Sequence, residues 1–368
     1  MAPPLYWPSA RQSAYPTNCI QQDEFTDWYF RVTKSEHLTK LKSKMKKVCD
    51  NSGIQKRHFH HAEEMIGVHP EIIDRAAPSL GARQAISAAA AHNLAADAAS
   101  RAISAWGRPA ADITHLVVTT NAGSQEPGTD LRLAGLRPAV RRMLLRRDIA
   151  ENNRGARVLV ACTQAHLLLS TSSSPWPCSA TALMPTPTLT LIRPAPSSSS
   201  AQCSTWRRPR RRRALPGTEH SVVMNLTESG LVHSRLSVEV PALVRGSIEW
   251  CLADTLAPLG LPNFGDGGWN GLFWALHPSG RAILDSYEAA LGLEAGKLAA
   301  SRHVLSEYGN MSGATVIFVL DEIRRHRRRR RRQDGSDKDC QWGVMSALGP
   351  GLTIETLVLH SAGSHDGN

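Results

Sequence analysis

The chain has 368 residues, of which 42% are hydrophobic, and it is long enough for roughly two to three domains with cores of their own. It contains no run of about 18 apolar residues, so we expect neither a transmembrane helix nor a membrane partner. The formal net charge of +11 comes from two arginine tracts, six arginines within 207–213 and eight within 324–332, and the remainder carries −3. We interpret the tracts as solvated and expect no nucleic-acid partner, with nuclear targeting or polyanion binding as the alternative.

The seven cysteines are scattered, and no two of them form a CxxC pair. This pattern argues against a disulfide framework and favours a reducing compartment. The N-terminus lacks a basic start followed by an apolar stretch, so we expect no secretory signal and a cytoplasmic location. His58, His60 and His61 lie near two glutamates but without the HExxH spacing, so we expect no metal site.

Alternating helices and strands are predicted from about Cys19 to Arg142, and no strand is evident before Asn18. Residues 33–52 have leucines, a methionine and a valine on one side and lysines on the other, which predicts an amphipathic helix. The alanine-rich residues 82–107 are apolar nearly all round, which indicates a buried helix. The short β-branched runs are typical of strands inside an α/β sheet. They are ITHLVVTTN (113–121) and ARVLVAC (156–162).

The composition changes between residues 165 and 213. From Ser170 to Arg213 the chain has no Gly, Asp, Glu or Lys, and Ser, Thr and Pro dominate. Low-complexity stretches of this kind bury too little apolar surface to offset the entropy of ordering. We therefore expect residues 165–213 to be disordered.

Ordered patterning resumes after Pro216 and continues nearly to the C-terminus. The arginine tract from Arg324 is expected to extend the last helix into solvent. Two strands joined by a Gly-Pro-Gly turn are expected to follow it. The predicted elements are helices at 240–260, 282–293 and 311–325, a buried strand at 272–277, and the strand pair within 342–361.

Two polar residues stand out in this half. His277 ends the buried strand and is followed by Pro278, Ser279 and Gly280, so its side chain can face a cavity from a loop. Asn310 lies in GNMSGA, where small residues allow close approach of a backbone or a ligand. A neutral histidine and an asparagine amide can both donate to one developing oxyanion. Taken alone, a histidine at this place is more often structural than catalytic.

These segments together resemble the plant type III polyketide synthases, the chalcone synthase group within the thiolase-like fold. The resemblance rests on the ordered elements HPSG (277–280), SEYGNMS (306–312) and GPG (349–351), and it covers about three quarters of the chain. TTNAG and GGWNGLFWA are most similar to the curcuminoid synthases of monocots.

The resemblance implies an α/β chain with αβαβα layers, a homodimer, and an acyltransferase that condenses an aromatic acyl-CoA with malonyl-CoA. The CoA thioesters are substrates, so no cofactor is implied. By resemblance, His277 and Asn310 hold the thioester carbonyl and stabilise the enolate derived from malonyl-CoA. Lys44 and Lys47 match positions that meet the CoA phosphates. The residues that match the loop lining the CoA tunnel are Ser279, Gly280 and Ala282.

The chain departs from the family where the nucleophile should lie. In the family a cysteine opens a buried helix, where its thiolate is stabilised. Here Met143-Leu144-Leu145 passes directly to Arg146, so the cysteine and the first turns of that helix are absent. Cys162 matches a non-nucleophilic position of the family.

We therefore expect an incomplete thiolase-like fold with an N-terminal half at 18–164, an aberrant insert at 165–213 and a C-terminal half at 214–362. Two functions stay open. One is a type III polyketide synthase homologue whose condensation is impaired. The other is a non-catalytic dimerising or basic interaction protein on the same scaffold.

Overall fold

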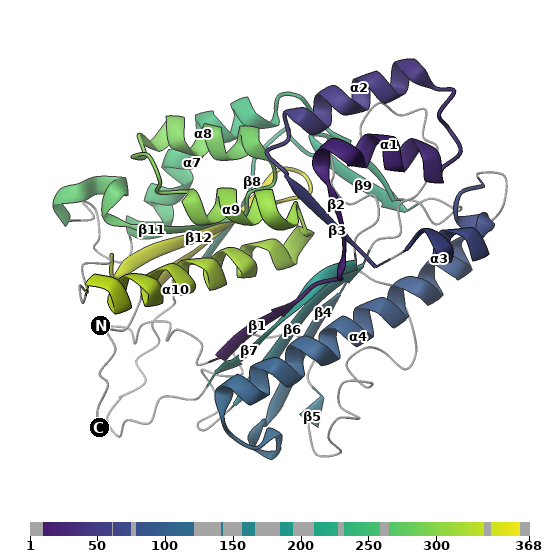
Figure 1. Ribbon diagram of the computed structural model, residues 1–368. Coiled ribbons are helices and arrows are strands. Elements are labelled where there is room, and N and C mark those ends of the chain that lie inside the picture. Colours follow the sequence, from purple (N-terminus) through teal and green to yellow (C-terminus); the bar gives the residue numbers. More distant parts are fainter. Residues whose placement is uncertain are drawn as a thin grey trace.

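The computed structural model in Figure 1 contains two main sheets flanked by helices, with two smaller strand pairs. It describes residues 10–60, 62–74, 79–120, 141–142, 157–165, 185–193, 210–226, 232–257, 265–334 and 340–360. None of the helices in these ranges is both long enough and apolar enough to cross a bilayer.

The first sheet has five strands in the order β1-β7-β6-β4-β5. β4 runs parallel to β5 and β6, whereas β7 is antiparallel to both of its neighbours, β1 and β6. The long helix α4 (Leu80–Trp106) lies along one face of this sheet (Figure 1). Its Ala95 and Ala99 pack against Leu116 and Leu159. The strands are β1 (Ala10–Ala14), β4 (His115–Thr120), β5 (Arg141–Arg142), β6 (Val158–Ala165) and β7 (Pro185–Arg193).

The structure differs from two expectations about this region. Strand β7 and strand β8 (Arg210–Ala214) lie in stretches of the predicted insert 165–213, whose disorder stays a prediction. Residues 188–192 read Thr-Leu-Thr-Leu-Ile, and this near alternation suits a strand although the surrounding composition does not. A strand, β1, also precedes Asn18. The rest of the predicted insert, apart from Ala165 at the end of β6, lies outside the described residues.

The second sheet has the order β11-β12-β13-β8, with β11 parallel to β12 and the other pairs antiparallel. α7 and α8 cover one face, and α9 and α10 lie on the other (Figure 1). The elements are β11 (Phe273–Leu276), β12 (Trp342–Gly349), β13 (Thr353–His360), α7 (Val240–Leu256), α8 (Arg281–Leu291), α9 (Ala299–Tyr308) and α10 (Thr315–Asp334).

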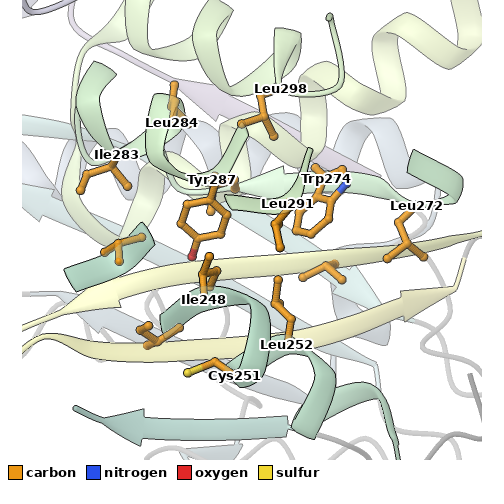
Figure 2. Packing of buried hydrophobic residues seen from close by; sticks show 14 of the residues in the cluster. Ile248, Cys251, Leu252, Leu272, Trp274, Ile283, Leu284, Tyr287, Leu291 and Leu298 are labelled. Carbon is orange, nitrogen blue, oxygen red and sulfur yellow. The ribbon is translucent and has the colours of Figure 1, made fainter. Parts of the chain in front are cut away.

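Strand β11 is apolar at every position because it is buried on both faces. Trp274 joins the cluster beneath α7 and α8, where Ile248, Leu252 and Tyr287 pack together, as Figure 2 shows. Phe273 joins the opposite cluster beneath α9 and α10. The strand therefore holds the residue that follows it, His277, in a fixed position between two helical layers.

The remaining elements surround these sheets. β2 pairs with β3, and β9 pairs with β10, both antiparallel. Phe25, Trp28 and Phe59 form an aromatic cluster between α1 and β3. The bounds are β2 (Asn18–Gln21), α1 (Gln22–Val32), α2 (Thr39–Asp50), β3 (Lys56–Phe59), α3 (Glu63–Val68), β9 (Val222–Leu226) and β10 (Val232–Leu236), with short 3-10 turns η1 (Pro70–Ile72), η2 (Ala110–Asp112), η4 (Gly265–Gly271) and η5 (Ser312–Ala314).

The mixed α/β class is confirmed, and so are the helices predicted at 33–52, 82–107, 240–260, 282–293 and 311–325, which correspond to α2, α4, α7, α8 and α10. The division into halves at 18–164 and 214–362 stays a prediction.

Candidate functional site

His277 is anchored at the end of β11. Its backbone N–H donates to the carbonyl oxygen of Ser346 on β12 at 2.8 Å, which continues the parallel ladder one residue beyond the strand. The side chain is buried, with 6% of its residue surface exposed. The chain then turns at Ser279, which has a φ of 56°, before α8 begins at Arg281.

The hydrogen bonds of the ring determine its protonation state. Nε2 lies 2.6 Å from the carbonyl oxygen of Ser312, and because a carbonyl only accepts, Nε2 carries the hydrogen. Nδ1 accepts from the backbone N–H of Ser279 at 3.1 Å and lies 3.0 Å from the Ser279 hydroxyl. These contacts assign the neutral Nε2–H tautomer. Burial lowers the pKa of His277, which favours the same neutral form.

Asn310 lies just after α9, beyond Gly309, whose φ of 69° ends the helix. Its Nδ2 donates to the carbonyl oxygen of Ser279 at 2.9 Å, and its Oδ1 accepts from the backbone N–H of Ser312 at 2.9 Å. His277 binds the loop of Asn310, and Asn310 binds the loop of His277. The sequence predicted that these two residues act at one place, and the structure brings their loops together.

A second layer of contacts holds Ser312. The Thr315 hydroxyl donates to the Ser312 carbonyl oxygen at 2.8 Å and accepts from the backbone N–H of Met311 at 2.8 Å. Ser312 and Ser279 both have a φ of 56°, a conformation that residues other than glycine seldom adopt. Sequence reasoning missed Ser312, Thr315 and Ser346, because backbone carbonyls and one hydroxyl make these contacts. The one feature of the sequence that could have indicated them is the pair of hydroxyl residues in SGAT (312–315), at the start of α10.

The site lies between the two main sheets. η5, which contains Ser312, contacts both β6 and β7 of the first sheet. His277 belongs to the second sheet. The candidate site thus joins the two halves of the chain.

The residues predicted to meet CoA lie on α2 and at the start of α8. Lys44 and Lys47 are exposed on α2, whose Met45 and Cys49 are buried. Gly53, just after α2, lies beside α8: a Cβ built on it would be 3.5 Å from the Cβ of Arg281. The end of α2 is therefore next to Ser279 and Gly280, which precede α8 and are half-buried, and to Ala282, which is exposed in the first turn of α8. Their roles toward CoA stay a prediction.

Burial makes the thiols of three described cysteines less acidic than a free cysteine. Burial raises the pKa of Cys162 to about 11, so the thiol is protonated at neutral pH. Burial also raises the pKa of Cys19 and of Cys251. Among the described residues no three His, Cys, Asp or Glu side chains gather as a metal site would require.

Two comparisons bear on the family. Residues 10–177 match the N-terminal domain of the chalcone and stilbene synthases, and residues 210–363 match the C-terminal domain. A bisdemethoxycurcumin synthase from Oryza sativa subsp. japonica is 47% identical over 372 residues, covering 95% of this chain and 90% of the relative. The chain therefore belongs to the chalcone and stilbene synthase family, the plant type III polyketide synthases.

Proposed function

We propose that this protein binds malonyl-CoA and an aromatic acyl-CoA as a type III polyketide synthase does, but that its condensation is impaired because it forms no acyl-enzyme. The observation that carries the proposal is the His277–Asn310 arrangement, in which two neutral donors from different loops are cross-linked through Ser279 and Ser312. We further infer a cytoplasmic homodimer, on the ground of the family alone.

The half-reaction that suits these two donors is decarboxylation of the malonyl thioester. The bond between the carboxylate and Cα breaks, carbon dioxide leaves, and the electron pair moves to the thioester oxygen as an enolate. Water then protonates the carbon, which yields acetyl-CoA. Hydrogen bonds aimed at the developing oxyanion in a site that excludes water stabilise the transition state.

The donors are supplied by the neutral imidazole and the amide. The Nε2–H of His277 is held by the Ser312 carbonyl, and a thioester oxygen would take the place of that acceptor. An asparagine amide has two N–H groups, and one of those on Asn310 holds Ser279. Neutral His277 polarises the oxygen as a hydrogen-bond donor through its Nε2–H.

Acyl transfer needs a nucleophile in addition. The sequence between β5 and β6 contains no cysteine, and burial keeps Cys162 protonated. A protonated thiol is a poor nucleophile. We therefore expect decarboxylation without transfer of the aromatic acyl group.

The test is conversion of malonyl-CoA to acetyl-CoA by the purified protein, followed by chromatography. We expect slow turnover, which His277→Ala and Asn310→Ala each reduce by about ten- to a thousandfold. Ala289→Ser is the matched control, because that exposed position on α8 has no predicted role toward CoA or in the donor pair. If the unaltered protein does not decarboxylate malonyl-CoA, the result supports the alternative function, a non-catalytic interaction protein. If both alanine variants decarboxylate it as fast as the unaltered protein, the His277–Asn310 pair is not the catalytic site.

A further inference from the structure

Helix α10 changes character along its length. Its first half is apolar, and Phe318, Val319 and Ile323 are buried in the cluster that contains Phe273. From Arg324 onward it carries eight arginines, the last of them Arg332. The charge run alone favoured solvated arginines without function, but the structure distinguishes two groups among them.

The first group is bound to the protein. Asp321, which is buried, pairs with Arg324 at 3.0 Å and with Arg325 at 2.9 Å. The guanidinium of Arg327 lies over the Phe273 ring, 4.5 Å from its centroid, and donates to the Cys340 carbonyl oxygen at 2.8 Å. These contacts fix the middle of α10 against the second sheet, and Asp321 offsets one of the two charges on Arg324 and Arg325.

The second group consists of Arg328, Arg329 and Arg332, which we call the α10 arginine surface. All three are exposed, and within the described part of the chain none of them has an ion pair or a hydrogen bond. Residues 328 and 332 are four apart and residues 329 and 332 three apart, so the three side chains share one side of the helix. Like charges at these spacings repel one another, and an anion that binds across them removes that repulsion.

The chemistry of this surface fits phosphate. Guanidinium groups bind phosphate oxygens through two parallel hydrogen bonds. A membrane-binding helix would need apolar side chains beside the cations, and residues 327–332 are all arginine. Outside the two arginine tracts the chain carries a net charge of −3, so a polyanion is attracted to the tracts rather than to the molecule as a whole.

We propose that the α10 arginine surface binds the phosphate backbone of a nucleic-acid duplex without reading its sequence. The helix is anchored by Arg324 and Arg327 and presents a short row of unpaired cations. The diameter of an α-helix with its side chains, about 10–12 Å, matches the width of a DNA major groove. This surface is separate from His277 and Asn310, so the proposal does not depend on the proposed enzyme activity.

Fluorescence anisotropy of the full-length protein with a labelled DNA duplex of about 20 base pairs tests the proposal over about 50 to 200 mM salt. We expect the logarithm of the binding constant to fall against the logarithm of salt with a slope of about −2.7, as three phosphate contacts require. The variant R328Q/R329Q/R332Q should bind at least about tenfold more weakly at the lowest salt. A scrambled duplex of equal length should bind as tightly as the first.

The matched control is K34Q/K40Q/R245Q, which removes the same charge from exposed positions on other elements. It should keep its affinity within about twofold, and circular dichroism should show that both variants are folded. Equal weakening in the control, or unchanged binding in the arginine variant, would overturn the proposal. So would binding to polyglutamate, or to vesicles containing phosphatidylserine, that is as tight as binding to the duplex.

Discussion

The Nε2–H of His277 donates to the carbonyl oxygen of Ser312 at 2.6 Å, although the two residues are separated by α8 and α9. Asn310 makes the reverse connection to the loop of His277 at 2.9 Å. Each proposed oxyanion donor is thereby held in place by the loop of the other. The geometry of the site should depend on Ser312 as much as on the two donors.

Thr315 is the residue that fixes Ser312, so its hydroxyl should contribute to stability. Replacement by Val keeps the shape but leaves the Met311 N–H unsatisfied in the interior. We expect the free energy of unfolding to fall by about 1–3 kcal/mol in urea denaturation. Thr315→Ser retains the hydroxyl and should recover most of this loss. Destabilisation by Ser but not by Val would show that the methyl group matters rather than the hydrogen bonds.

The stability of the protein should decrease in mild acid. Burial lowers the pKa values of His58, His60 and His277, so the unfolded chain binds protons that the folded chain does not. The stabilisation is present above the unfolded pKa of about 6.5 and is lost as the pH falls below it. Each histidine contributes a slope of at most about 1.4 kcal/mol per pH unit. Urea denaturation between about pH 8 and pH 5 measures this, and a flat or rising stability toward acid would contradict the assignment.

Gly343 allows β11 and β12 to approach. A Cβ built at this position would lie 2.4 Å from Cδ2 of Phe273, its partner in the parallel register. Gly343→Ala should lower the free energy of unfolding by about 1–3 kcal/mol, because the ring must move within a packed core. Gly246→Ala is the control, since that exposed helical position has no heavy atom within 4 Å of the new Cβ. We expect this control to be neutral or to stabilise by up to about 1 kcal/mol in thermal unfolding.

The backbone amides of β7 should exchange slowly with solvent. This strand is bonded on both sides, to β1 and to β6. Hydrogen exchange followed by mass spectrometry of peptides covering residues 185–193 measures the protection. Exchange as fast as in an unfolded peptide would restore the interpretation of this stretch as disordered, and protection close to that of β6 would support the sheet.

The sequence predicted the helices and strands whose hydrophobic pattern is long or uninterrupted. The alanine-rich α4 and the amphipathic α2 were found in place, and the apolar β11 was read as a buried strand because no polar residue interrupts it. β7 was missed because its near alternation is short and lies in a Ser- and Pro-rich segment. The pairing of β7 with β1 is a long-range contact, which no local pattern carries.

The candidate site was predicted only in part for a similar reason. His277 and Asn310 follow recognisable motifs, so the resemblance identified them. The tautomer of His277 depends on a carbonyl oxygen from a different loop, and the spacing of residues 277 and 312 in the chain says nothing of that contact. In the same way, eight arginines look alike in the sequence, but only contacts with Asp321 and Phe273 distinguish those that anchor α10.

We propose that this family member has the donor pair but lacks a nucleophile that can form an acyl-enzyme. Intact-mass measurement after incubation with an aromatic acyl-CoA tests it most directly, with a thiol reagent as the control for accessible cysteines. We expect an unchanged mass with the thioester, even where the reagent labels exposed Cys19. One stoichiometric acyl adduct, mapped by peptide fragmentation to Cys162 or to any other cysteine, would contradict it.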